Sequence, residues 1–359
     1  MESILIKGRL YMEHLSIRPN KMVVYTRECK PSINDYDYKG GLIIENGKEI
    51  KTKNNLLGSN KNLNKHNFEL SPQAQKNIQE KITWLYHFSR KKTILLQSGK
   101  VISDFRMNFV TLTLPSVQRH SSDFLVKNCW NQLITELANK CYLENYVWRL
   151  EYQKNGNIHF HLATDVFMNY NVVRDSWNRI LEKFEYVTEY SNKFKRMSLL
   201  EYWNNYSNKE KSNFAEIQKR YAKGCREDWK KPHSVDVKVC TNSKAVAFYI
   251  SKYFGKLSSP GSQTVLEVNE SNSGNSRLWF CSRSLSKLKA ISDIREAMRE
   301  DFLALLFRAG KFRKVVCDYC IVYYYDMKDL DLFGFQRLSL LFDEYAGEKN
   351  YEASYVLTR

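Results

Sequence analysis

Two histidines one residue apart, His159 and His161, are the residues of this chain most suited to chemistry. On a β-strand the side chains of residues i and i+2 point to the same face, so the two imidazoles would lie together. Glu151 adds a carboxylate to that face if its strand pairs with theirs in the right register. Two imidazoles and one carboxylate can hold a divalent ion and leave coordination positions open. Mn²⁺ or Mg²⁺, bound partly through phosphate oxygens of a substrate, suits such a site, with Zn²⁺ as an alternative.

The register depends on the turn between the two strands. A two-residue Asn-Gly turn would mix apolar and polar side chains on each face of the hairpin. A three-residue turn with Gly156 in the left-handed conformation pairs Glu151 with His159 and Arg149 with His161. Only this turn keeps one face apolar, and a slip of one residue is costly when a face is buried. The sequence therefore predicts the three-residue turn, with both histidines and the carboxylate on one polar face.

A second group of chemically active residues lies further along the chain. Tyr249, Lys252, Tyr253 and Lys256 share one face of a predicted helix, at positions i, i+3, i+4 and i+7. Such a face is most simply a solvated face of an amphipathic helix. A neighbouring cation and a metal ion would instead make a phenolate accessible below the usual phenol pKa of about 10. A tyrosine activated in this way can attack phosphorus and form a phosphotyrosine link.

Local patterns predict the elements that must position these residues. A run of β-branched and aromatic residues from Phe109 to Pro115 predicts a central strand. Ser71 followed by Pro72 predicts the start of a helix that ends near Ser89. Residues 257–276 are rich in Ser, Gly and Asn and predict a linker. The other patterns predict helices over 122–137, 172–184, 214–223, 245–256, 285–308 and 338–345, and strands over 146–153, 158–162, 234–239 and 315–325.

The chain is strongly basic, with a formal net charge of +17 at pH 7 over 359 residues. This charge favours a polyanionic partner, nucleic acid first and an anionic membrane surface second, and a basic protein without such a partner is the third possibility. The longest apolar run, residues 302–307, is far shorter than the roughly 20 residues that cross a bilayer, and no stretch resembles a signal peptide. Eight scattered cysteines predict reduced thiols, and the single CxxC at Cys317 and Cys320 lacks the second pair of ligands that a zinc finger needs.

In their order along the chain, these motifs resemble a known family. An apolar strand that begins at Phe109, the His-Phe-His strand and the Tyr-x-x-Lys-Tyr helix resemble the three motifs of HUH-superfamily rolling-circle replication initiators. The third motif is similar to that of the two-tyrosine A-type and Rep proteins of microviruses and related bacterial single-stranded DNA phages or plasmids. The resemblance covers residues 71–256. It implies an α+β fold, the HUH endonuclease fold, in which helices pack on a central antiparallel sheet.

The resemblance also implies roles for individual residues. The metal ligands would be His159, His161 and Glu151, the nucleophiles Tyr249 and Tyr253, and the residue on the scissile phosphate or the phenolate Lys252. The cations expected to contact DNA are Arg149, Lys244 and Lys256.

The implied activity is the nicking and joining of single-stranded DNA at a replication origin. A 5′-phosphotyrosine intermediate would form, and the freed 3′-OH would prime rolling-circle synthesis. Residues 41–48 are the nearest approach to a P-loop, but their spacing is wrong and Glu49 stands in place of Ser or Thr. Unwinding would therefore fall to a host helicase, and extension to a host polymerase. We expect the protein to act in the cytoplasm of a bacterial host, without a membrane partner.

The predicted domains are an N-terminal extension of unknown role (1–70), the HUH endonuclease domain (71–256), the linker (257–276) and a C-terminal α/β region (277–359). Within the second of these, residues 188–232 form a basic insertion rich in tyrosine, which predicts phosphate contacts and base stacking.

Two alternatives stay open. One is a conjugative relaxase or HUH transposase; relaxases usually place the tyrosine before the histidine motif, the opposite of the order here, which favours a replication initiator. The other is a non-catalytic nucleic-acid-binding protein whose histidines and tyrosines only pack or stack.

Overall fold

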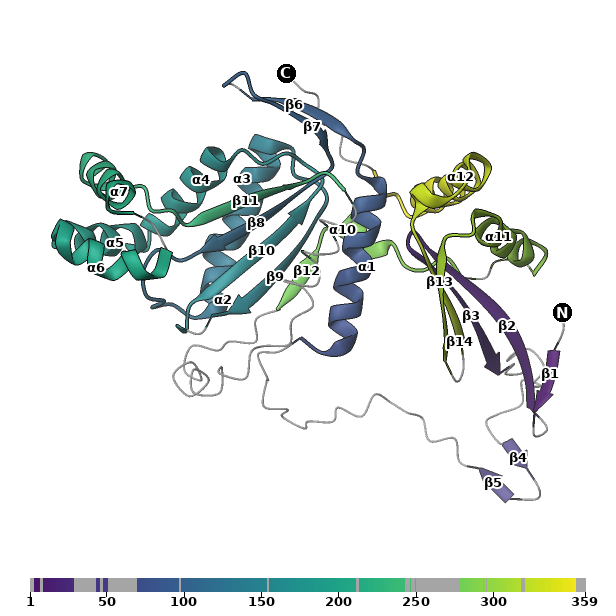
Figure 1. Ribbon diagram of the computed structural model, residues 1–359. Helices are drawn as coiled ribbons and strands as arrows, with labels where there is room; N and C mark the ends of the chain where they lie inside the picture. Colours follow the sequence, from purple (N-terminus) through teal and green to yellow (C-terminus); the bar gives the residue numbers. More distant parts are fainter. Residues whose placement is uncertain are drawn as a thin grey trace. The chain divides into compact units, whose positions relative to one another are not determined.

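The computed structural model divides into two compact units (Figure 1). The smaller unit comprises Met1–Asn67 and Ala290–Phe342, and the larger unit comprises Phe68–Lys289 and Asp343–Arg359. Each unit combines an antiparallel sheet with helices, which confirms the predicted α+β class. Within the described part of the chain, no helix is both long and apolar enough to span a membrane. The structure describes residues 3–6, 9–28, 43–45, 48–50, 70–96, 98–153, 155–210, 213–242, 246, 249, 278–292, 294, 296–317 and 320–352.

A five-stranded antiparallel sheet forms the centre of the larger unit, in the order β11-β8-β10-β9-β12. Its middle strands are the predicted apolar strand and the strand of the two histidines, so both motifs lie side by side. The strands are β8 (Met107–Thr113), β9 (Tyr146–Tyr152), β10 (Ile158–Thr164), β11 (Val235–Cys240) and β12 (Trp279–Cys281).

Helices cover one face of this sheet, as Figure 1 shows for α3 and α4. Side chains alternate along each strand, and the apolar set that includes Leu112, Leu150 and Phe160 points into this helical layer. There it packs around Trp130 and Trp177, both at most 1% exposed. The opposite face of the sheet is left to the alternate, largely polar residues. The covering helices are α2 (Ser122–Leu125), a π-helical turn (Val126–Trp130), α3 (Asn131–Cys141) and α4 (Tyr170–Glu182).

Further elements of the larger unit flank the sheet. Helix α1 begins as predicted, because the Ser71 hydroxyl accepts a hydrogen bond from the backbone N–H of Ala74 at 3.1 Å. It packs against α10 and β9, and Lys81 donates to the carbonyl oxygens of Ser286, at 3.2 Å, and Leu288. These elements are α1 (Pro72–Phe88), β6 (Lys92–Leu95), β7 (Val101–Phe105), α5 (Tyr186–Lys195), α6 (Leu199–Glu210), α7 (Phe214–Arg226) and α10 (Arg283–Lys287).

The smaller unit has its own five-stranded sheet, in the order β1-β2-β3-β14-β13. Strand β3 pairs with β14, so the regions 1–70 and 277–359, which we predicted as separate parts, contribute strands to one sheet. Its core includes Leu15, Ile17 and Phe302, each at most 2% exposed. Its elements are β1 (Ser3–Ile6), β2 (Arg9–Arg18), β3 (Lys21–Glu28), the hairpin of β4 (Ile43–Glu45) and β5 (Lys48–Ile50), α11 (Glu296–Ala309), β13 (Phe312–Cys317), β14 (Cys320–Tyr325), a 3₁₀ turn (Met327–Asp329) and α12 (Leu332–Glu348), which it contains up to Phe342.

Two local predictions in the C-terminal region are wrong. The single helix over 285–308 is in fact two helices, α10 and α11, because Ile291 between them forms an antiparallel bridge with Ile17. The single strand over 315–325 is a hairpin, in which Cys317 lies opposite Cys320. The predicted linker and most of the predicted helix over 245–256 lie outside the described residues, although residues 246 and 249 are helical.

Candidate active site

The β9–β10 hairpin has the predicted three-residue turn. Gly156 adopts a φ of +86°, and the backbone N–H of Gln153 donates to the carbonyl of Asn157 at 2.8 Å. The strands consequently pair Glu151 with His159 and Arg149 with His161, and the predicted register is confirmed. Without a Cβ, glycine reaches this positive φ with no steric cost, which explains its position here.

His161 is held between two partners across the sheet. Its Nε2 lies 2.7 Å from Oε2 of Glu151 on β9, and its Nδ1 lies 3.2 Å from the hydroxyl oxygen of Thr111 on β8. The side chain is only 4% exposed, whereas that of Glu151 is 29% exposed. Both ring nitrogens are therefore engaged, and the ring has one defined orientation.

His159 lies on the same face, with its ring centroid 6.0 Å from that of His161. Its Nδ1 is 3.2 Å from the side-chain nitrogen of Gln153, which donates to it. Burial and the charge of His161 lower the pKa of His159 to about 4, against the opposite effect of Glu151. The imidazole is neutral at pH 7 as a result, which is the protonation state that a metal ligand requires.

The carboxylate of Glu151 is ionised at neutral pH. Burial alone would raise its pKa, but the hydrogen bond and charge of His161, together with the charges of Arg149 and His159, outweigh burial and lower the pKa. Arg149 itself is 3% exposed. Its burial places the guanidinium as a charge that acts on Glu151, and leaves little of it available for the DNA contact that we predicted from the sequence.

The donor chemistry of this face suits a divalent ion, but the ligands are not gathered around one point. Within the described ranges, no group of three or more His, Cys, Asp or Glu side chains is arranged to hold a metal. The reason is visible at His161, whose Nε2 is occupied by its hydrogen bond to Glu151. A metal would have to take the place of the proton between these two atoms.

Tyr249 lies over the same face of the sheet as the histidines. Its ring stacks on that of Phe109, with centroids 4.7 Å apart and planes at 11°. Phe109 and Thr111 alternate on β8 and so share a face, and Thr111 contacts His161. Residues i and i+2 on a strand are about 7 Å apart, so the phenol lies about one such step from the His161 row. The other predicted residues of this group, Lys244, Lys252, Tyr253 and Lys256, lie outside the described residues.

Sequence reasoning missed the polar residues that support the site. Thr111 and Gln153 orient the two imidazoles, and Asn157 ties the hairpin to the segment after β8 by donating to the Ser116 carbonyl at 2.8 Å. These contacts join residues distant in sequence or depend on the turn. Asp236, which faces Thr111 from β11, instead pairs with Lys238 at 3.2 Å.

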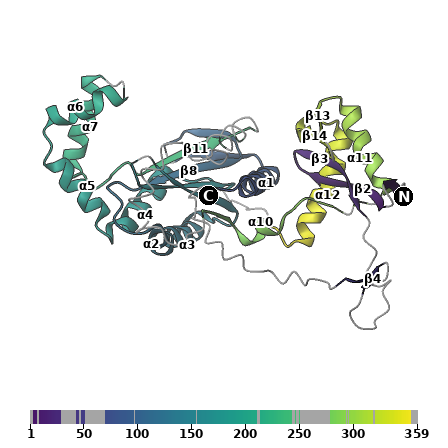
Figure 2. The same cartoon turned by 90° about the horizontal axis from the view of Figure 1, so that it is seen from below.

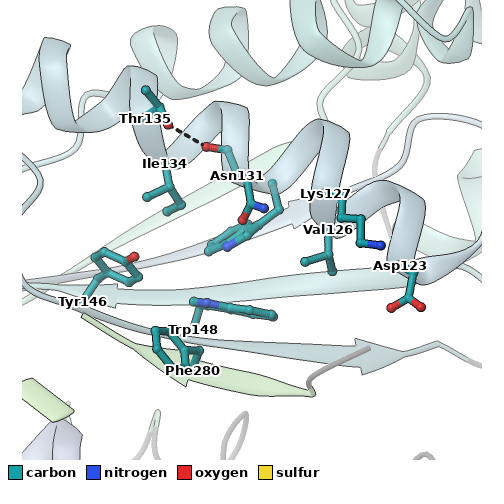
Figure 3. A pocket seen from close by; sticks show the side chains of 10 residues that line it. Asp123, Val126, Lys127, Asn131, Ile134, Thr135, Tyr146, Trp148 and Phe280 are labelled. Carbon is teal, nitrogen blue, oxygen red and sulfur yellow. Dashed lines mark hydrogen bonds between the residues drawn. The ribbon is translucent and has the colours of Figure 1, made fainter. Parts of the chain in front are cut away.

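A pocket of about 510 Å³ lies on the opposite, helical side of the sheet (Figure 3). Trp148 and Tyr146 of β9 and Phe280 of β12 form its floor, and the helical segment from Asp123 to Thr135 forms its roof. Trp148 alternates along β9 with Arg149 and so points away from the histidine face. The sheet thus separates this pocket from the histidines, and its aromatic lining provides no cluster of groups for phosphate chemistry.

No curated protein and no solved structure matches the chain. A family model does match the larger unit, and the matched segment runs from the first residue of β8 to just beyond the Tyr-x-x-Lys-Tyr motif. It contains the histidine strand, the stacked Phe109 and Tyr249, and the insertion. Residues 107–258 match the model of the ORF2 family of replication-associated proteins, which confirms the family resemblance seen in the motifs and is consistent with a rolling-circle replication initiator.

Proposed function

We propose that this chain cuts and rejoins single-stranded DNA at a replication origin, with Tyr249 as a nucleophile and a divalent metal held by His159, His161 and Glu151. The observation that carries the proposal is the stacking of Tyr249 on Phe109, on the sheet face that bears both histidines. A reaction at one phosphorus atom needs the nucleophile and the metal ligands on one surface. The family match of residues 107–258 supports the same role in replication.

In the proposed reaction, the phenolate oxygen of Tyr249 forms a bond to phosphorus, and the bond from phosphorus to the 3′ oxygen breaks. The 5′ side of the DNA stays on the protein as a phosphotyrosine, and the 3′ oxygen takes up a proton to become a free 3′-OH. The phenolic proton passes to water. Attack by a 3′-OH on the phosphotyrosine reverses the step, so joining needs no ATP. Tyr253 would act as the second nucleophile, and Lys252 would hold the phosphate.

The residues that would hold the metal are already in suitable protonation states. Glu151 is ionised and His159 is neutral at pH 7, because of the pKa shifts described above. Oxygen and imidazole donors with open positions fit Mg²⁺ or Mn²⁺. When bound, such an ion would polarise the scissile phosphate and favour the phenolate. Single-stranded origin DNA is the proposed substrate, and a host helicase and polymerase are the proposed partners.

A cleavage assay tests the proposal. Single-stranded origin oligonucleotides are incubated with the protein and Mn²⁺, and covalent adducts are separated on a denaturing gel. We expect an adduct with the wild type and none with the double variant Tyr249→Phe and Tyr253→Phe. Tyr142→Phe is the matched control, because Tyr142 is 66% exposed at the end of α3 and should be dispensable. DNA binding without any adduct, across a library of origin sequences, would favour the non-catalytic alternative.

A further inference from the structure

Helices α5, α6 and α7 form a helical subdomain within the larger unit, and Figures 1 and 2 both show it extending from the α4 side of the sheet. Its interior is aromatic. Phe194 and Trp229 stack with centroids 4.9 Å apart, and Tyr202, Tyr206 and Tyr221 surround them. Phe194 is 5% exposed and Trp229 is 6% exposed. These rings hold the subdomain together, and they are not available to stack on bases as the sequence led us to predict.

The outer face of α7 is basic. Ile217, Tyr221 and Gly224 point inward at i, i+4 and i+7, where Gly224 lets the Trp229 ring approach. Lys219, Lys223 and Arg226 are exposed on the remaining surface. Two ion pairs join charged residues of this subdomain among the described residues, Lys195–Asp228 at 2.7 Å and Lys230–Asp228 at 3.1 Å, and neither involves these three cations.

Both ends of the subdomain are anchored beside the row of His159. At its start, the hydroxyl oxygen of Tyr186 accepts from the backbone N–H groups of Arg119, at 3.1 Å, and His120, at 3.2 Å. At its end, the backbone N–H of Thr113 donates to the carbonyl of Ser234 at 2.8 Å, and Thr113 pairs with His159. The subdomain therefore leaves the sheet at the end that carries the candidate active site.

We propose that Lys219, Lys223 and Arg226 bind the phosphate backbone of double-stranded DNA that flanks the nicked strand. From Lys219 to Arg226 the helix rises about 10 Å, the length of about three phosphates along one strand of a duplex. A regular duplex presents phosphates at such a fixed spacing, whereas single-strand binding relies on stacking rings, and the central rings here are buried. The proposal rests on the proposed function only for DNA as the ligand.

The test compares the triple variant Lys219→Ala, Lys223→Ala and Arg226→Ala with the wild type. Binding of one fluorescent duplex, and of its single strand, is measured by anisotropy between 50 and 200 mM salt, in EDTA so that no cleavage occurs. Loss of three phosphate contacts lowers the salt slope by about 2.7. Duplex affinity of the wild type should consequently fall about 40-fold more than that of the variant over this range. The control variant replaces two lysines and one arginine exposed elsewhere on the larger unit, Lys76, Arg283 and Lys287.

Each outcome decides the proposal. An unchanged duplex salt slope in the triple variant would overturn it, as would a loss confined to the single strand. If the variant fails to fold, chemical modification of lysines in the wild type replaces it, and the duplex should protect Lys219 and Lys223 from modification; equal reactivity with and without duplex would overturn the proposal. The triple variant should still form the covalent adduct with a single-stranded oligonucleotide, so failure of this proposal is distinct from failure of the nicking mechanism.

Discussion

Replacing Thr111 with valine tests whether His161 is an oriented metal ligand. The change keeps the shape of the side chain and removes the hydroxyl that lies 3.2 Å from Nδ1 of His161. Thr113→Val is the matched control on the same strand and the same face. Its hydroxyl donates to the carbonyl of Ser234 at 3.3 Å, and its loss leaves the contacts of His161 unchanged.

The expected magnitudes separate stability from metal binding. Each variant loses one partly buried hydrogen bond, so each should lower the free energy of unfolding by about 1 kcal/mol. Only Thr111→Val removes a group that orients a proposed ligand, and removing such a group typically lowers metal affinity about 10-fold to 100-fold. The two variants should therefore have similar stability and different metal requirements.

Adduct formation on an origin oligonucleotide is measured at increasing Mn²⁺ concentration, with urea denaturation in parallel. We expect the half-maximal Mn²⁺ concentration to rise about 10-fold to 100-fold for Thr111→Val and to stay within about twofold of wild type for Thr113→Val. Equal metal requirements in the two variants, at equal stability, would refute the idea that the row from Thr111 to Glu151 positions His161 for a metal.

Three further predictions concern stability and are measured by urea denaturation. Gly224→Ala should lower the free energy of unfolding by about 1–3 kcal/mol, because an added Cβ would lie 2.4 Å from the Trp229 ring. Gly156→Ala should cost about 1–2 kcal/mol, because its φ is +86°; a neutral effect would argue against the three-residue turn. Stability should fall as the pH drops from 6.5 toward 4, because burial lowers the pKa of His159 to about 4 and the unfolded state then binds more protons, and the lowered pKa of Glu151 acts in the same direction. His159→Gln should flatten this profile.

The hairpin of the site was predictable because its signals are local. Alternation along both strands, together with Gly156 in the turn, fixes the pairing of Glu151 with His159. The start of α1 at Ser71 and Pro72 was predictable for the same reason. Such features depend on a few neighbouring residues, whose conformational preferences the rest of the fold does not overrule.

Long-range contacts were not predictable. Nothing near Thr111 indicates that its hydroxyl meets His161, and the stacking of Tyr249 on Phe109 joins residues far apart in the chain. The pairing of β3 with β14 likewise leaves no local signal. The helix over 285–308 was overpredicted because its apolar spacing continues through Ile291, although that residue bridges to β2. In each case the tertiary context decides between conformations that the local sequence allows.

Mapping the site of covalent attachment tests the central claim most directly. The wild-type protein is incubated with Mn²⁺ and a single-stranded origin oligonucleotide, the adduct is digested, and the DNA-linked peptide is sequenced by tandem mass spectrometry, with EDTA and His161→Ala as controls. The proposed mechanism predicts DNA on Tyr249 or Tyr253, and no adduct in either control. A link at any other residue, or an adduct that forms equally well in EDTA and with His161→Ala, would contradict a shared site of tyrosine and metal.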